Sequence, residues 1–186
     1  MTNYSLPIFS ETAAALAVLL GGVSSVGVIG RAKGLEGVFG CVLETTSGKL
    51  VEVRAQQQDL QYKFEVFPVG ASITTTADFE EKRPLSLEAP VQVFLLQTQD
   101  WLDPEISCEG ALGDSPIMQC QGRPGQAPST AVAACTYFGG VELRGSNGLS
   151  LTIATLAFPF AIYVSAIDKT GEIDRNAFQA IALGAG

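Results

Sequence analysis

Two long uncharged stretches interrupt an otherwise alternating sequence of apolar and polar residues. The first covers the 19 residues 12–30, and the second covers the 23 residues 145–167. A helix needs roughly 20 apolar residues to cross the hydrocarbon layer of a bilayer. The pattern therefore predicts two transmembrane helices, at residues 12–30 and 149–167.

Small side chains recur at every fourth position in both stretches, and in a helix they would share one face. Such ridges allow two helices to approach each other closely inside a bilayer. The expected helix-packing residues are Ala13, Ala17, Gly21, Ser25, Ala157, Ala161 and Ser165. Chance is the competing explanation, because alanine, glycine and serine are simply common in both stretches.

The second stretch also fits a β structure. Residues 141–153 alternate between apolar and polar on both sides of Asn147-Gly148, a dipeptide typical of tight hairpin turns. In this alternative, residues 149–167 form two buried strands of a sandwich. The first stretch is then a single buried helix.

Between the two stretches, the sequence predicts a β-rich domain. Short alternating segments separated by turn residues are typical of small sandwiches and barrels. The expected strands are Val38–Glu44, Lys49–Ala55, Leu60–Pro68, Val91–Thr98, Ile117–Gln121 and Ala131–Arg144, the last broken at Gly139-Gly140. Turns or loops are expected at Glu80–Pro84 and Gly122–Pro128.

The predicted fold class is mainly β, a small antiparallel sandwich or open barrel flanked by N- and C-terminal apolar segments that form two transmembrane helices. The parts are an N-terminal tail (1–11), a transmembrane helix (12–30), a β-rich domain (31–148), a second transmembrane helix or buried strands (149–167) and a C-terminal tail (168–186). Within the last tail, Asp174–Leu183 predicts a short helix that begins at a capping Asp174.

Composition and charge narrow the range of functions. Charged residues make up 16% of the chain and apolar residues 47%, and 11 Lys+Arg against 19 Asp+Glu give a net charge of −8. Binding to phosphates needs clustered Lys and Arg, so no nucleic-acid partner is expected. Histidine is absent, which excludes a Ser-His-Asp triad, a Cys-His pair and an HExxH zinc site. No catalytic residue, cofactor or metal ligand is predicted, and the protein is not expected to be an enzyme.

The remaining candidate chemistry is weak. The acidic residues Asp100, Asp103, Glu105, Glu109 and Asp114 carry oxygens that suit Ca²⁺, but their spacing matches no known loop, so a solvated acidic loop is expected. The cysteines Cys41, Cys108, Cys120 and Cys135 form no CxxC pair and are expected to be small buried side chains. A Cys108–Cys120 bridge is the alternative in an oxidising compartment.

Three functions from different classes follow from these features. The first is a non-catalytic, membrane-anchored accessory subunit or assembly factor of a larger membrane protein complex. It would act through protein–protein contacts of its β domain and helices, with other subunits and the lipid bilayer as partners. The second is a structural subunit of a virion or surface filament, with the apolar segments buried between subunits. The third is a soluble enzyme that lacks histidine chemistry.

Basic residues near the ends of the two stretches predict an orientation in the membrane. Arg31 and Lys33 follow the first stretch and Arg144 precedes the second, whereas the N-terminal tail has no basic residue and the C-terminal tail has Lys169 and Arg175. Loops rich in Lys and Arg tend to stay in the cytoplasm. The expected location is a multi-pass membrane protein whose β domain faces the cytoplasm, stroma or matrix.

Overall fold

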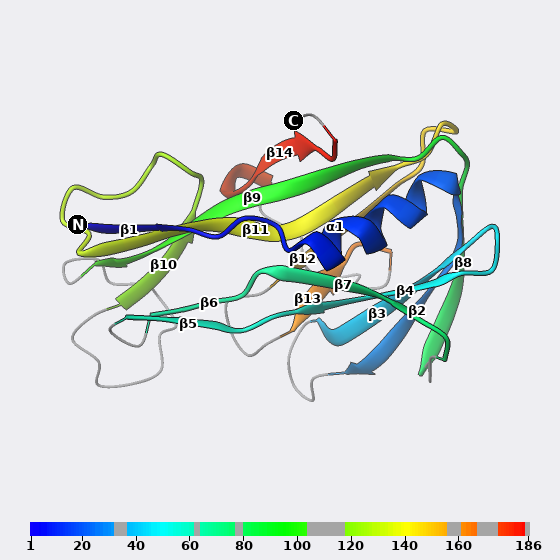
Figure 1. The fold of residues 1–186 in the computed structure, drawn as a ribbon, viewed down its shortest axis with the longest axis horizontal. Helices are drawn as coiled ribbons and strands as arrows, with labels where there is room; N and C mark the ends of the chain where they lie inside the picture. Colours follow the sequence, from blue (N-terminus) through cyan, green and yellow to red (C-terminus); the bar gives the residue numbers. More distant parts are fainter. Residues whose placement is uncertain are drawn as a thin grey trace.

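Antiparallel β-strands form most of the protein, as the sequence predicts. The computed structural model describes residues 1–31, 37–61, 64–76, 80–103, 118–155, 161–166 and 175–184. Within these ranges lie one large sheet, a separate two-stranded hairpin and a single α-helix, α1 (Ser10–Ala17) (Figure 1). The short 3₁₀ segment η1 (Val18–Gly21) directly continues α1.

One half of the large sheet has the strand order β8–β2–β3–β4–β7, and every neighbouring pair is antiparallel. The bounds of these strands are β2 (Val23–Arg31), β3 (Val38–Thr45), β4 (Leu50–Ala55), β7 (Val69–Thr74) and β8 (Glu81–Leu87). Among the described strands, β8 pairs only with β2, and β7 pairs only with β4. These two strands are therefore the edges of this half.

The other half is built on β9 (Gln92–Asp103) and β11 (Ala133–Arg144), which pair antiparallel along most of their length. Around this pair lie β1 (Thr2–Ser5), β10 (Met118–Gly122), β12 (Ser150–Thr155), β13 (Ile162–Val164) and β14 (Gln179–Ala182). β12 and β13 continue the sheet beyond β11, and Ile162 of β13 pairs with Val38 of β3 to join the two halves. β10 and β14 pair with β9, and β1 pairs in parallel with β11.

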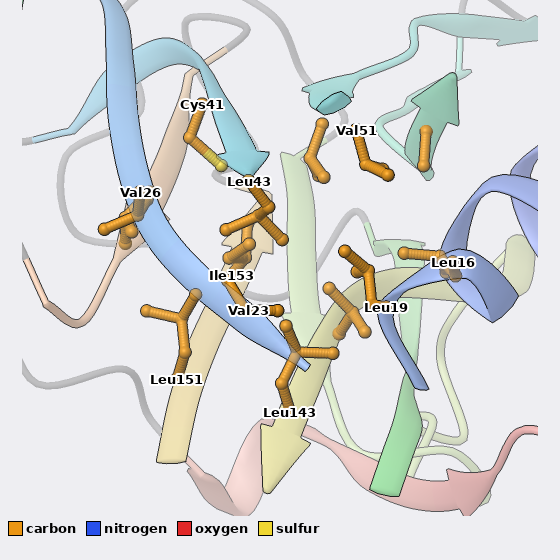
Figure 2. Packing of buried hydrophobic residues seen from close by; sticks show 14 of the residues in the cluster. Leu16, Leu19, Val23, Val26, Cys41, Leu43, Val51, Leu143, Leu151 and Ile153 are labelled. Atoms are coloured by element: carbon orange, nitrogen blue, oxygen red, sulfur yellow. The ribbon is translucent and has the colours of Figure 1, made fainter. Parts of the chain in front are cut away.

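A core of aliphatic side chains lies between the two halves (Figure 2). Successive side chains of a strand point to opposite faces, so alternate residues of each strand enter this core. Leu43 and Val51 come from the first half, and Leu143, Leu151 and Ile153 come from the second. The last turn of α1 and the following η1 add Ala15, Leu16 and Leu19 to the same cluster. In Figure 1, α1 lies between the half that contains β9 and β11 and the half that contains β7.

The prediction of a transmembrane helix at residues 12–30 is not supported. These residues form most of α1, all of η1 and most of β2. Gly22, with φ at 106°, ends the helical part and turns the chain into β2. The stretch lacks charge because Leu16, Leu19, Val23, Val26 and Val28 are fully buried inside the domain. No helix in the described ranges has the length and apolar character needed to cross a membrane.

The second uncharged stretch forms strands, as the alternative interpretation predicts. Residues 151–155 of β12 and all of β13 are buried. The hairpin between β11 and β12 turns at Asn147-Gly148, where Gly148 has φ at 82° and the Gly145 N–H donates to the Leu149 carbonyl at 2.9 Å. The prediction of a transmembrane helix at 149–167 is therefore not supported either, although residues 156–160 and 167 lie outside the described ranges. Both stretches belong to the same sheet as the central β domain.

Most of the expected strands in the middle of the chain are confirmed. Observed β3, β4, β9, β10 and β11 overlap the predicted ranges, and β11 has its irregularity between Phe138 and Gly140, beside the predicted break. Leu60–Pro68 is not one strand, because β5 (Gln58–Leu60) and β6 (Phe64–Val66) pair as a hairpin.

Two further local predictions differ from the structure. Glu80–Pro84 was expected as a turn, but most of it is the start of β8, an edge strand, where proline is tolerated because one side of the strand needs no hydrogen bonds. The short helix expected at Asp174–Leu183 is replaced by a 3₁₀ turn at Arg175–Ala177 followed by β14. β14 pairs with β9, so tertiary pairing overrides the local helix signal.

Candidate functional site

The small residues of the first stretch do not form a single helix face. Ala13 and Ala17 lie on α1 and Gly21 ends η1, but Ser25 lies in β2. Ala17 and Gly21 are exposed, whereas the buried face of α1 carries Thr12, Ala15 and Leu16. The correction has a simple cause: the four-residue spacing has meaning only within one continuous helix, and this helix ends before Gly22.

The small residues of the second stretch also lie outside any helix. Ala161 is fully buried and Ser165 is exposed in a turn after β13, while Ala157 lies outside the described residues. The Ser165 hydroxyl accepts a hydrogen bond from the Thr152 N–H at 3.0 Å, and the Ser165 N–H donates to the Thr152 carbonyl at 2.9 Å. Ser165 therefore ties the end of β13 to β12.

An open groove of about 740 Å³ lies beside the start of α1. Its lining residues are Phe9–Thr12, Glu52, Arg54–Gln58 and Gly70–Ser72. Glu52 and Arg54 point to the outer face of β4, because Val51 and Val53, which alternate with them along the strand, point into the core. We call this hollow the α1–β7 groove.

Charged side chains in the α1–β7 groove are largely compensated. Arg54 donates a hydrogen bond from Nε to Glu52 Oε1 on the same strand. Glu11 lies in the first turn of α1, where the exposed N–H groups of a helix favour a negative charge. The residue before α1 is Phe9, whose side chain cannot cap the helix and is 40% exposed.

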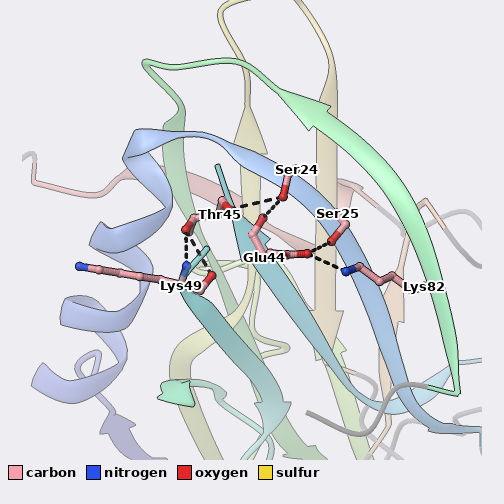
Figure 3. A network of polar contacts seen from close by, with 6 residues as sticks. All are labelled: Ser24, Ser25, Glu44, Thr45, Lys49 and Lys82. Carbon is pink, nitrogen blue, oxygen red and sulfur yellow. Dashed lines mark hydrogen bonds and ion pairs between the residues drawn. The ribbon is translucent and has the colours of Figure 1, made fainter. Parts of the chain in front are cut away.

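A second polar group joins three strands on the outer face of the first half (Figure 3). Glu44 on β3 accepts hydrogen bonds at Oε2 from Ser25 Oγ on β2 at 2.8 Å and from Lys82 Nζ on β8 at 2.7 Å. These contacts lower the pKa of the Glu44 carboxyl, the bond from Lys82 contributing most. We interpret this group as a brace between β8, β2 and β3, because the carboxylate on β3 bonds to Ser25 on the adjacent β2 and to Lys82 on β8, the next strand beyond it.

A third polar group is buried at the end of the molecule where β9, β10 and β11 meet. Asp100 is fully buried, and its Oδ2 accepts hydrogen bonds from Gln119 Nε2 at 2.9 Å and from the Tyr137 hydroxyl at 3.1 Å. Gln119 also donates to the Glu65 carbonyl and so connects β10 to the β5–β6 hairpin. Asp100 Oδ1 is buried without a hydrogen-bond partner among the described residues.

Burial controls the titration of this group. Removal from water raises the pKa of the Asp100 carboxyl to about 7, against the opposing effect of the bonds from Gln119 and Tyr137. Burial also raises the pKa of the Tyr137 hydroxyl well above its usual value, and the nearby Asp100 carboxylate adds to this shift. The expectation of a solvated acidic loop is therefore wrong for Asp100, and for Asp103, which is also buried and accepts a hydrogen bond from Thr130 at 2.7 Å.

The cysteines fall into two chemical states. Cys41 and Cys135 are buried free thiols, as expected for small apolar side chains. Cys120 is disulfide-bonded. Cys108, the partner expected for Cys120 in an oxidising compartment, lies outside the described residues.

Metal binding finds no support in the part of the chain that the structure describes, where no cluster of three or more cysteine, aspartate or glutamate side chains has a metal-binding arrangement. The acidic residues Glu105, Glu109 and Asp114 lie outside this part.

Comparison with known proteins finds no match: no family model, no curated protein and no solved structure matches the chain. The function must therefore be argued from the groove, the polar groups and the sheet edges.

Sequence reasoning missed both the α1–β7 groove and the buried position of Asp100. For the groove, one signal was available: Glu52 and Arg54 alternate with buried valines on β4, which predicts a polar outer face. For Asp100 the strand β9 was predicted to end at Thr98, so the carboxylate was placed in a loop.

Proposed function

We propose that the protein is a non-catalytic structural subunit of a larger assembly, and that it joins the assembly through the open edge of β7. The observation that carries this proposal is the direction of the backbone groups at Ile73.

Hydrogen bonds on both sides of β7 define its inner and outer edges. The Gln56 N–H donates to the Pro68 carbonyl at 2.8 Å. The even-numbered residues of β7 therefore point their backbone N–H and carbonyl groups toward β4. The Ala71 N–H instead donates to Thr12 Oγ1 of α1 at 3.3 Å, away from β4. Successive residues of an antiparallel strand point their backbone groups alternately toward the partner and away from it. Ile73 therefore directs its N–H and carbonyl away from β4, beyond the part of the edge that Thr12 covers.

The two edges of this half differ in how they resist pairing with another chain. Natural proteins protect exposed sheet edges with charges and proline. β8 has such protection in Glu81, Lys82, Arg83 and Pro84. The segment Ser72–Thr74 of β7 has neither charge nor proline, and its Ile73 side chain is 57% exposed. An unprotected edge of this kind favours a partner strand.

The simplest occupant of this edge is a second copy of the chain. An antiparallel edge can pair with its own copy around a two-fold axis, which needs only one unprotected strand and produces the same contact twice. No like charges would meet in such a pair, because Ser72, Ile73 and Thr74 are all uncharged. The two copies would also bury the exposed isoleucine side chains.

The proposal keeps protein–protein contacts and omits the membrane anchor, because neither of the two stretches that suggested a bilayer partner forms a long apolar helix in the described residues. The proposed location also changes. Disulfides persist in oxidising compartments and are rare in reducing ones. The disulfide at Cys120 therefore favours an oxidising compartment over the cytoplasm, stroma or matrix.

Sedimentation velocity over a range of protein concentrations tests this function. We expect the wild type to form a concentration-dependent dimer and Ile73→Lys to weaken it by at least tenfold, because a lysine on each copy would place like charges across the new strand pair. Leu149→Lys is the matched control, since Leu149 is 50% exposed on the β11–β12 hairpin and should leave the dimer unchanged. A wild type that stays monomeric at every concentration, or equal effects of both variants, would contradict the proposal.

A further inference from the structure

The α1–β7 groove is lined by small residues of β7 and by longer polar residues of the elements beside it. Gly70, Ala71 and Ser72 are the lining residues that β7 contributes. The others come from the start of α1 and from β4 with the glutamine run 56–58. Its volume of about 740 Å³ lies within the usual range of small-molecule sites, roughly 300–1,000 Å³.

The Gln56 side chain occupies space that a side chain at residue 70 would otherwise fill. A Cβ atom on Gly70 would lie 2.3 Å from Gln56 Nε2 and 2.4 Å from Gln56 Cδ. The amide of Gln56 therefore rests directly against the β7 backbone. Gly70 itself is buried as a result, while Gln56 remains exposed to the groove.

The lining offers donors and acceptors side by side. The Arg54 guanidinium only donates, the carboxylates of Glu11 and Glu52 only accept, and the glutamine amides and serine hydroxyls do both. Ligand hydroxyl groups also donate and accept, so they match a mixed lining better than groups that do only one. This inventory favours a ligand with several neighbouring hydroxyls.

The net charge of the lining argues against charged ligands. Glu52 and Arg54 form an ion pair on β4, which leaves Glu11 as the remaining charged side chain of the lining. A single carboxylate repels anions and lacks the second acidic partner that would hold a cation firmly. The lining therefore fits a neutral molecule.

An aromatic ring supplies the apolar part of the site. Phe9 is the one aromatic residue of the lining and is 40% exposed. Aromatic side chains offer a flat apolar face of large area. The C–H face of a sugar ring packs on such a surface while its hydroxyls point to the polar lining residues. We propose that the α1–β7 groove binds a neutral saccharide, with Phe9 as the packing face and Gln56 and Ser72 as hydrogen-bonding partners.

Chemical-shift mapping with named sugars tests the proposal. Glucose, galactose, mannose and the disaccharides maltose and lactose are titrated into ¹⁵N-labelled protein. We expect at least one of them to shift the amides of Gly70, Ala71 and Ser72 and the side-chain NH₂ of Gln56. Gluconate and glucosamine, which add a negative and a positive charge, should bind more weakly than glucose. Tighter binding of a disaccharide than of its monosaccharide would identify a glycan chain as the source, and equal binding a free sugar.

The variant Gly70→Ala separates the site from the fold. The new methyl group would displace the Gln56 side chain from Cγ outward, and that side chain is exposed and flexible, so we expect nearly unchanged thermal stability and about tenfold weaker sugar binding through loss of hydrogen bonds. Gly21→Ala is the matched control, because no atom lies within 4 Å of its added Cβ. Absence of groove shifts with every sugar, stronger binding of either charged probe, or unaltered affinity in a folded Gly70→Ala variant would overturn the proposal. The dimer test at Ile73 is independent of each of these results.

Discussion

Tyr137 donates its hydroxyl hydrogen to Asp100 Oδ2 across 3.1 Å, between the neighbouring strands β11 and β9 and out of contact with water. The carboxylate accepts a second bond from Gln119, yet one of its oxygens has no partner among the described residues. An ionised carboxylate without full hydrogen bonding is costly in a protein interior. The pair therefore links the stability of this end of the fold to pH.

The first prediction concerns that link. Burial raises the pKa of Asp100 to about 7 in the folded protein, whereas an unfolded aspartate titrates near 3.9. Between these values the folded state holds a proton that the unfolded state has lost, so the contribution of Asp100 to the free energy of unfolding decreases as pH rises. Asp100→Asn removes this dependence. Urea unfolding near pH 4.5 and pH 8 should show the wild type losing about 3 kcal/mol relative to the variant.

A constant difference between wild type and Asp100→Asn at the two pH values would contradict this prediction. Tyr137→Phe provides a further check, because it removes one bond to the carboxylate and keeps the ring. The variant should raise the pKa of Asp100 further, since the hydroxyl bond favours the charged form.

The second prediction concerns the attachment of α1 to the sheet. Leu16 is fully buried in the main core, and Leu16→Ala should lower the free energy of unfolding by about 2–5 kcal/mol through loss of contacts and a residual cavity. Leu20→Ala, four residues on and 44% exposed, should cost less than about 1 kcal/mol. Urea unfolding measures both. Equal losses would show that α1 is not anchored through Leu16.

The third prediction concerns the irregularity in β11. A Cβ atom on Gly140 would lie 2.5 Å from the Ile153 carbonyl oxygen and 3.0 Å from Ala154 Cα, both backbone atoms of β12. Backbone in a paired strand cannot move as a flexible side chain can, so Gly140→Ala should cost about 1–3 kcal/mol. Thermal unfolding should show a lower midpoint for Gly140→Ala than for Gly21→Ala, which has free space around its Cβ. Identical midpoints would refute the clash.

The fourth prediction concerns thiol reactivity. Burial raises the pKa of Cys135 to about 12 and the pKa of Cys41 even further, so neither forms the reactive thiolate at neutral pH. Iodoacetamide should leave both unmodified in the native protein and modify both in denaturant. Cys120 should become modified only after reduction. Peptide mass spectrometry assigns each site, and labelling of Cys120 without a reductant would contradict the disulfide.

Local patterns in the sequence predict much of this fold because they reflect local physics. Asn147-Gly148 specifies a hairpin since the turn needs a positive φ, and Gly148 supplies it at 82°. The same reasoning holds for the β3–β4 hairpin, where Gly48 has φ at 82°. Alternation on β4 and β11 likewise identifies their buried faces.

Hydropathy averaged over a long window cannot distinguish a membrane helix from a short buried helix that is followed by a buried strand. A buried helix and a buried strand are each apolar, so α1, η1 and β2 together have the composition of a membrane helix. Gly22 marks their boundary, but glycine is also common in membrane helices and gives no separate signal. The discriminating feature is tertiary: Val23 and Val26 pair with β3 and β8.

The α1–β7 groove and the Asp100 group also depend on tertiary contacts. Phe9 and Ser72 are far apart in the sequence and meet only because α1 packs beside β7. Asp100 is buried because Gln119 and Tyr137 arrive from two other strands. Sequence reasoning gives the polar character of such residues, but it gives neither their neighbours nor their exposure.

The parallel pairing of β1 with β11 has a consequence for how the chain folds. Thr2 pairs with Ala133 and Ser5 with Thr136, so β1 must wait for its partner until β11 has been synthesised. Contacts between distant segments also slow folding, because the loop between them must close first. Until then β1 has no partner strand, whereas the strand beside α1, β7, has already been synthesised. We therefore expect β1 to pair after β2, β3, β4 and β7, whose mutual contacts lie closer together in the sequence.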